Sequence, residues 1–161
     1  MSEVKAVPQT SADPDVTSGV AQFLGPVVTD LTALSVDGKQ AHWHVRGANF
    51  QAVHELLDLL VDHAREYADT AAERVVALGL PIDARIQTVG DKATTPQLTA
   101  GFQQSALVIA EVIAQIDATL VTIRTAVDEL ADLDPVSQDV AIEIARALEK
   151  DRWFLFAHIA P

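Results

Sequence analysis

Four stretches of this 161-residue chain carry apolar side chains at the three- and four-residue spacing of an α-helix. Such spacing places the apolar residues of a helix on one face, which must be buried against another element. The stretches cover 16–45, 50–78, 97–133 and 136–157. Four long amphipathic helices in one chain of this size predict an all-α fold, a four-helix bundle with a single core.

Glycine, proline and polar caps separate these stretches where helices are expected to end. Gly47 and Gly79 each follow the last periodic residue of a stretch, as glycines at helix C-termini do. Asn49 stands where the second helix needs its N-cap. Asp134 and Pro135 interrupt the pattern between the third and fourth helices. The breaks therefore agree with the periodicity.

The chain begins with a polar segment, 1–15, which we expect to be a flexible tail in front of a bundle domain at 16–161. The segment holds three acids, one lysine and two prolines. Asp15 or Thr17 is the expected cap of the first helix. Inside that helix, Pro26 removes an N–H donor, which predicts a kink or an irregular first part.

Residues 80–97 form a long connection between the second and third helices. Its length exceeds that of an ordinary helix–helix turn, so we expect it to cross the length of the bundle or to cover an interface. A short helix is expected near 83–89. Thr95 and Pro96 have the order of a cap and a first helical proline, which predicts the start of the third helix there.

Charge and composition narrow the classes of function. The net charge is −12, and the eleven lysines and arginines are scattered, which disfavours nucleic acid as a partner because cationic contacts to phosphate dominate DNA affinity. Cysteine is absent, so a disulfide framework and a thiolate metal site are excluded, and a cytoplasmic location is expected. We find neither a secretory signal nor an apolar run of about 18 residues that would predict a membrane span.

One stretch carries residues that bind hard or borderline metals: His42, His54, Asp58, Asp69 and Glu73. The last four form two i, i+4 pairs on the second helix. With His54 at zero angle and 100° per residue, the other three lie at about 40°, 60° and 100°. All four share one helix face, which points away from the apolar stripe.

The two pairs cannot share one metal within a chain. Asp58 and Asp69 are about 16 Å apart along the helix axis, whereas metal–ligand bonds measure about 2.0–2.2 Å. Each pair is therefore half a site. The pairs lie symmetrically about the middle of the helix, so an antiparallel two-fold pairing of two copies would bring His54 to Glu73 and Asp58 to Asp69. His42 could fold back to join His54.

Three carboxylates and two imidazoles suit Fe(II), Mn(II) or Zn(II), with positions left open for an oxidant. The alternative is a solvated charged helix face, which is common on helical proteins. Trp43 is expected to serve packing, and His44 and His63 lie off the ligand face and are expected at the surface.

A second group of acids surrounds the corner between the third and fourth helices: Asp128, Glu129, Asp132, Asp134 and Asp139. It is either a solvated helix end or an electrostatic funnel that draws cations to a symmetry axis.

Lys39 to Gly79 read K-x-x-H-W-x-x-x-G-A-N-F-x-x-x-H-x-x-x-D and then D-x-x-A-E-R-x-x-x-L-G. This pattern resembles the Dps family of mini-ferritins, DNA-binding proteins from starved cells. The motif covers about a quarter of the chain, and the helical layout extends the resemblance over nearly all of it. The resemblance implies a ferritin-like bundle, assembled as a hollow dodecamer with a pair of ferroxidase sites at each two-fold interface.

The resemblance also implies roles for the five candidate ligands. His42, His54 and Asp58 would come from one subunit, and Asp69 and Glu73 from its two-fold mate. Fe(II) would be oxidised there by hydrogen peroxide or O2 and stored as ferric mineral, which limits hydroxyl-radical damage to DNA. Iron is the implied metal, and no organic cofactor is implied.

Four further positions match features of the family. Trp43 corresponds to a residue beside the site, and Glu55 resembles an acid that nucleates mineral. Asp134 and Asp139 lie where the family builds its iron-entry pores.

The N-terminal segment departs from the family members that bind DNA, which usually carry a tail rich in lysine and arginine. We therefore expect direct DNA binding to be weak or absent, although a nucleoid-compacting protein and a purely structural helical oligomer stay open as alternatives. A 24-subunit ferritin is disfavoured, because the third and fourth helices lack Glu-x-x-His pairs.

Overall fold

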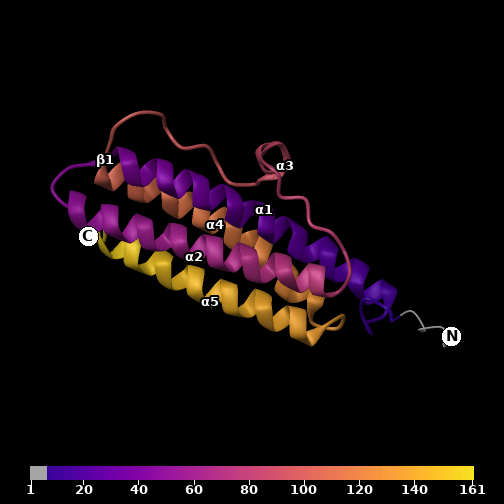
Figure 1. Cartoon of the computed structure of the whole chain (residues 1–161). Helices are drawn as coiled ribbons and strands as arrows, with labels where there is room; N and C mark the ends of the chain where they lie inside the picture. The colour runs from indigo at the N-terminus through magenta and orange to yellow at the C-terminus, as the bar shows by residue number, and fades with distance from the viewer. Residues whose placement is uncertain (1–6) are drawn as a thin grey trace.

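A computed structural model describes residues 7–161, so the first six residues of the expected tail lie outside the described residues. The elements in chain order are α1 (Pro14–His44), β1 (Val45–Arg46), α2 (Phe50–Ala77), α3 (Ile86–Lys92), β2 (Gln103–Gln104), α4 (Ser105–Leu130) and α5 (Pro135–Ala157). The four long helices lie side by side as a bundle (Figure 1). The predicted all-α fold is confirmed.

The connection between α2 and α4 determines how the helices are arranged. α1 packs mainly against α2 and α4, while α5 packs against α4 and α2. The connection passes along α1 and carries α3 on the way (Figure 1). At its far end, β2 pairs in parallel with β1 through Val45↔Gln103 and Arg46↔Gln104. The expectation that this segment crosses the length of the bundle is confirmed.

The core consists of leucine, isoleucine and valine side chains from all four long helices. Its largest fully buried members are Leu24, Leu31, Leu34, Leu57, Leu60, Ile109, Ile116, Leu120, Ile123, Leu130, Ile144 and Leu148. Phe50, Phe102 and Leu107 lie outside this core and are exposed in the single chain.

Two apolar helices could be mistaken for membrane spans. By length and composition alone, α1 and α4 would be able to cross a membrane. In the bundle, 56% of the most apolar window of α1 and 44% of that of α4 are buried against other helices. Long core helices of globular proteins show the same hydropathy, so hydropathy alone does not assign either helix to a membrane.

The start of α1 differs from the prediction. Asp13 is the cap, because its side chain accepts the Asp15 N–H at 2.8 Å, so the expected caps Asp15 and Thr17 were wrong. The helix then continues through Pro26 without a break. Gln22, whose carbonyl loses its helical donor at Pro26, is an exposed residue, so water can replace that donor.

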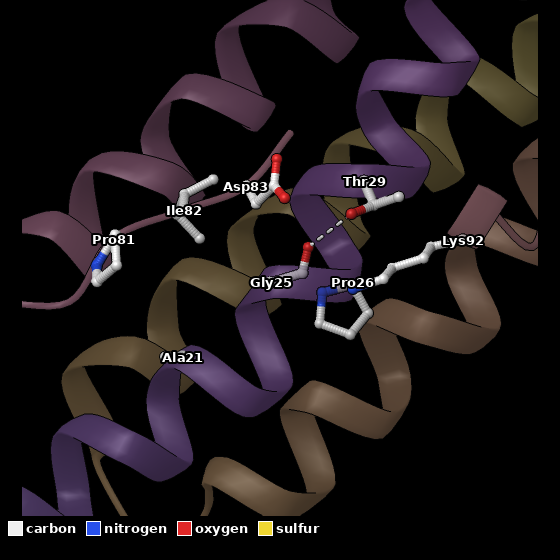
Figure 2. A pocket seen from close by; sticks show the side chains of 8 residues that line it. All are labelled: Ala21, Gly25, Pro26, Thr29, Pro81, Ile82, Asp83 and Lys92. Carbon is white, nitrogen blue, oxygen red and sulfur yellow. Dashed lines mark hydrogen bonds between the residues drawn. The ribbon is translucent and has the colours of Figure 1, made fainter. Parts of the chain in front are cut away.

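Pro26 lines a pocket of about 410 Å³ between α1 and the connection, which contributes Pro81 and Ile82. Figure 2 shows the proline ring beside Gly25, whose carbonyl accepts a hydrogen bond from the Thr29 hydroxyl at 3.2 Å. Pro26 is itself exposed, so its ring lies outside the core, where the helix can tolerate it.

The start of α4 is the largest error of the sequence-based prediction. The helix begins at Ser105 rather than near 97, and Thr95 and Pro96 do not cap it. Instead, the Pro96 carbonyl accepts a hydrogen bond from Gln115 Nε2 at 2.8 Å. Gly101 has φ +88°, which a helix cannot contain. The segment before α4 is therefore held along the bundle as a non-helical strap.

A buried carboxylate fastens this strap further along. Asp30 on α1 is 1% exposed and accepts hydrogen bonds from the Thr94 N–H (2.8 Å), the Thr94 hydroxyl (2.7 Å) and the Thr122 hydroxyl (2.6 Å). These bonds join α1, the connection and α4 at one point. α3 itself lies three residues later than predicted, at Ile86–Lys92.

Candidate metal centre

A tight turn between α1 and α2 brings the first candidate ligands together. Gly47 has φ +118°, a backbone conformation that residues with a Cβ rarely adopt, which favours glycine at this turn. The turn lets α2 fold directly back along α1. His42, near the end of α1, therefore faces His54, in the second turn of α2.

The two imidazoles form a reciprocal pair. His42 Nδ1–H donates to the backbone carbonyl of His54 at 2.8 Å, and His54 Nδ1–H donates to the carbonyl of His42 at 2.8 Å. The rings stack with centroids 3.6 Å apart, and His42 is 7% exposed. Because a carbonyl only accepts, each Nδ1 carries a proton, which leaves the Nε2 of each ring as the atom that can bind a metal.

Asp58 lies one turn beyond His54 and is already engaged within its own chain. The Lys39 ammonium contacts its carboxylate, and the His42 Nδ1 lies 3.9 Å from Asp58 Oδ1. The hydrogen bond from Lys39 lowers the pKa of Asp58 below its usual range. The carboxylate is therefore ionised and oriented before any metal binds.

Asp69 and Glu73 lie further along α2, and both are exposed. Within residues 7–161, neither side chain takes part in an ion pair. Nor does this part of the chain contain a group of three histidine, aspartate or glutamate side chains placed to hold a metal by itself. The structure thus places His42, His54 and Asp58 near one another without a complete metal site among them, and it leaves Asp69 and Glu73 apart, as two half-sites would require.

Two further candidate residues, Trp43 and Glu55, are neighbours of His42 and His54 in sequence, and both are exposed. Trp43 was expected to serve packing. It is 61% exposed, however, and so is not buried within its own chain. Glu55 is exposed and accepts a hydrogen bond from Gln51 Nε2 at 3.0 Å. A role for Glu55 in mineral nucleation stays a prediction.

The two candidate pore acids differ in their surroundings. Asp134 caps α5 and accepts hydrogen bonds from Ser137 and, at 2.8 Å, from Arg74 Nη2. Burial opposes ionisation of Asp134, but the hydrogen bonds from Ser137 and Arg74 outweigh it and lower its pKa. Asp139 is exposed. Of the two, only Asp139 has a carboxylate directed to solvent rather than used inside the fold.

The structure contains one imidazole–carboxylate pair that the sequence did not predict. His63 was expected at the surface, but its Nδ1 lies 2.9 Å from Asp151 on α5, and Asp151 is 3% exposed. Burial raises the pKa of Asp151, and the hydrogen bond from His63 opposes that shift. His44 is also half-buried, with Nδ1 bonded to the Gln40 carbonyl at 2.9 Å.

Comparison with known proteins first identifies the class of protein to which the bundle belongs. The family model for the ferritin-like domain matches residues 22–160, nearly the whole bundle. The structure of Dps from Microbacterium arborescens in the high iron form is 57% identical and superposes with a TM-score of 0.91, covering 93% of this chain and 98% of that one.

Two curated relatives give a similar picture at lower identity. The DNA protection during starvation protein of Mycolicibacterium smegmatis is 32% identical over 142 residues, which are 88% of this chain and 78% of that protein. The fine tangled pili major subunit of Haemophilus ducreyi is 30% identical over 140 residues, which are 87% of this chain and 74% of that protein. The chain belongs to the Dps family of ferritin-like proteins, and the resemblance inferred from its motif is confirmed.

Proposed function

We propose that this protein stores iron and is a ferroxidase whose sites form between two copies of the chain. Each site would combine His42, His54 and Asp58 of one copy with Asp69 and Glu73 of a two-fold-related copy. The observation that carries the proposal is the reciprocal imidazole pair, which leaves two Nε2 lone pairs at the surface of one half-site. An imidazole held by a carbonyl at Nδ1 is the usual arrangement of a histidine that binds metal.

The chemistry of the donor set supports iron as the metal. Two imidazoles and three carboxylates provide borderline and hard ligands, which Fe(II) accepts. In the proposed reaction, two Fe(II) ions each lose one electron. One hydrogen peroxide molecule takes up both electrons and two protons, its O–O bond breaks, and two water molecules form. Molecular oxygen is the alternative oxidant.

The proposed assembly is a hollow dodecamer in which the ferric product accumulates as mineral. Consuming peroxide by two-electron chemistry prevents it from forming hydroxyl radicals, and so protects DNA. In this proposal Asp139 attracts Fe(II) toward an entry pore, and Glu55 supports mineral growth. Both carboxylates are exposed, as these roles require.

We place this activity in the cytoplasm and expect direct DNA binding to be weak. The chain carries a net charge of −12, and a shell of twelve copies multiplies that charge. Repulsion from DNA phosphates then exceeds what scattered lysines can offset. A mobility shift of plasmid DNA by the iron-free protein, at neutral pH and moderate salt, would contradict this expectation.

Subunit complementation tests the shared site. One variant, His54→Ala/Asp58→Ala, lacks the first half-site, and a second variant, Asp69→Ala/Glu73→Ala, lacks the other. Each alone should fail to oxidise Fe(II) rapidly with peroxide. In a mixed two-fold dimer, one of the two sites would regain all its ligands. With random pairing, shells reassembled from equal amounts should recover about a quarter of the wild-type sites.

The control is a mixture of wild-type shells with each variant, reassembled in the same way. Ferric absorbance, recorded after anaerobic addition of Fe(II) and peroxide, reports the rate. Recovery of activity in the mixed variants supports an intersubunit site. Wild-type rates in either variant alone, or no recovery in shells shown to contain both variants, would contradict the assignment.

A further inference from the structure

Lys39 occupies a position next to the proposed ligands that their metal chemistry does not explain. It lies on α1, three residues before His42, and so on the same face of that helix. Its ammonium contacts the Asp58 carboxylate, and its side chain is 27% exposed. Asp58 therefore already has a cationic partner within its own chain.

Two electrostatic relations follow from this contact. A divalent metal on Asp58 would lie within a few ångströms of the ammonium, and two positive charges at that separation repel. Without a metal, however, the proposed two-fold interface would bring Asp58 close to another carboxylate, that of Asp69 from the second copy. Two carboxylates sharing a site repel unless a cation lies between them.

We propose that Lys39 is a positioning residue that acts as the counter-ion of the metal-free site and sets its metal affinity. The ammonium balances and orients Asp58 before metal arrives, and metal binding displaces it from that carboxylate. The inference rests on the proposed intersubunit site. In this inference the positive charge of Lys39 weakens metal binding and stabilises the metal-free interface.

Zinc titration calorimetry on the assembled protein at neutral pH tests this role, with Zn²⁺ as a redox-inert probe. Lys39→Met removes the charge and keeps the length of the side chain, whereas Lys39→Arg keeps the charge. Lys92→Met is the matched control, because it removes a lysine that lines a pocket beside Thr29, about 15 Å along α1 from position 39. His54→Ala/Asp58→Ala reports whether the calorimetric signal arises at the proposed site.

We expect Lys39→Met to bind Zn²⁺ about tenfold more tightly than wild type, because a nearby unit charge no longer opposes the metal. Lys39→Arg and Lys92→Met should bind Zn²⁺ as wild type does. Without metal, Lys39→Met shells should dissociate at lower denaturant concentration than wild-type shells, and Zn²⁺ should reverse the difference.

The possible failures can be told apart. Equal or weaker Zn²⁺ binding by Lys39→Met, with wild-type binding that is lost in His54→Ala/Asp58→Ala, would overturn the role of Lys39 and leave the site intact. Zn²⁺ binding that survives in His54→Ala/Asp58→Ala would overturn the proposed site, and with it this inference.

Discussion

The two halves of the proposed metal centre differ in how much of their geometry one chain supplies. The first half is built within the chain, because His42 and His54 fix each other through backbone carbonyls and Lys39 holds Asp58. The second half, Asp69 and Glu73, is an exposed pair on the same helix. The geometry of the first half is thus fixed within one chain, while that of the second depends on where another copy places it. Metal binding and assembly are therefore expected to stabilise each other.

The largest expected effect is on catalysis and is the same for both halves. His54→Ala and Glu73→Ala should each slow peroxide-dependent Fe(II) oxidation by about a hundredfold, since loss even of groups that only orient a ligand costs about tenfold to a hundredfold. Stopped-flow ferric absorbance measures the rate. Glu149→Ala, an exposed glutamate on α5 paired with Arg124, is the control. A normal rate in either variant would remove that half from the site.

Substitutions in the two halves should differ in how much they lower the free energy of unfolding. His54→Ala removes the donor to the His42 carbonyl at a buried residue, so it should lower the free energy of unfolding by about 1–3 kcal/mol. Glu73→Ala removes an exposed side chain and should change it by no more than about 0.5 kcal/mol. Denaturant unfolding in EDTA measures both variants. A loss of no more than about 0.5 kcal/mol for His54→Ala would show that the imidazole pair contributes little to stability and that the two halves do not differ in this respect.

The second histidine of α2, His63, gives a finer test, because its partner comes from the same chain. His63 faces Asp151, whose pKa is raised by burial against the opposing effects of His63 and Lys150. A carboxyl with a raised pKa stabilises the fold most below its unfolded pKa of about 3.9, and this contribution is lost as pH rises through the folded pKa. Asp151→Asn cannot titrate and escapes this loss.

The melting temperature of Asp151→Asn should therefore gain on that of wild type as pH rises from about 4 to 7. The comparison is best repeated in a His63→Gln background, which removes titration of the imidazole and leaves the burial of Asp151. The expected shift is a few degrees. A difference that shrinks with rising pH would show that the charged pair outweighs burial.

The helices were largely predictable, because their apolar stripes are properties of contiguous sequence. Helix ends that are set by contacts between residues far apart in the sequence were not predictable. Thr95 and Pro96 have the order of a helix start, yet the Pro96 carbonyl bonds to Gln115, and α4 begins only at Ser105. The glycine that interrupts the expected helix, Gly101, reveals its positive φ only in the fold.

The site shows the same division between local and distant information. The shared face of His54, Asp58, Asp69 and Glu73 follows from the helical repeat, and family motifs place His42 beside it. The contact between Lys39 and Asp58 joins two helices, and His63 lies 88 residues from Asp151 in sequence. Such pairs depend on the register between packed helices, which periodicity does not determine. Proximity of Lys39 to His42 on one face of α1 was the only local hint.

The strap between α2 and α4 is a surface segment whose path is fixed by buried side chains. It is fixed at Asp30, and again where Gln115, which is fully buried, bonds to Asp37 (2.6 Å) and to the Pro96 carbonyl (2.8 Å). A surface ordered before encounter loses little conformational entropy on docking. A partner that docked on this face would therefore meet a rigid surface, so the rate would be set by collision and orientation rather than by a slow folding step.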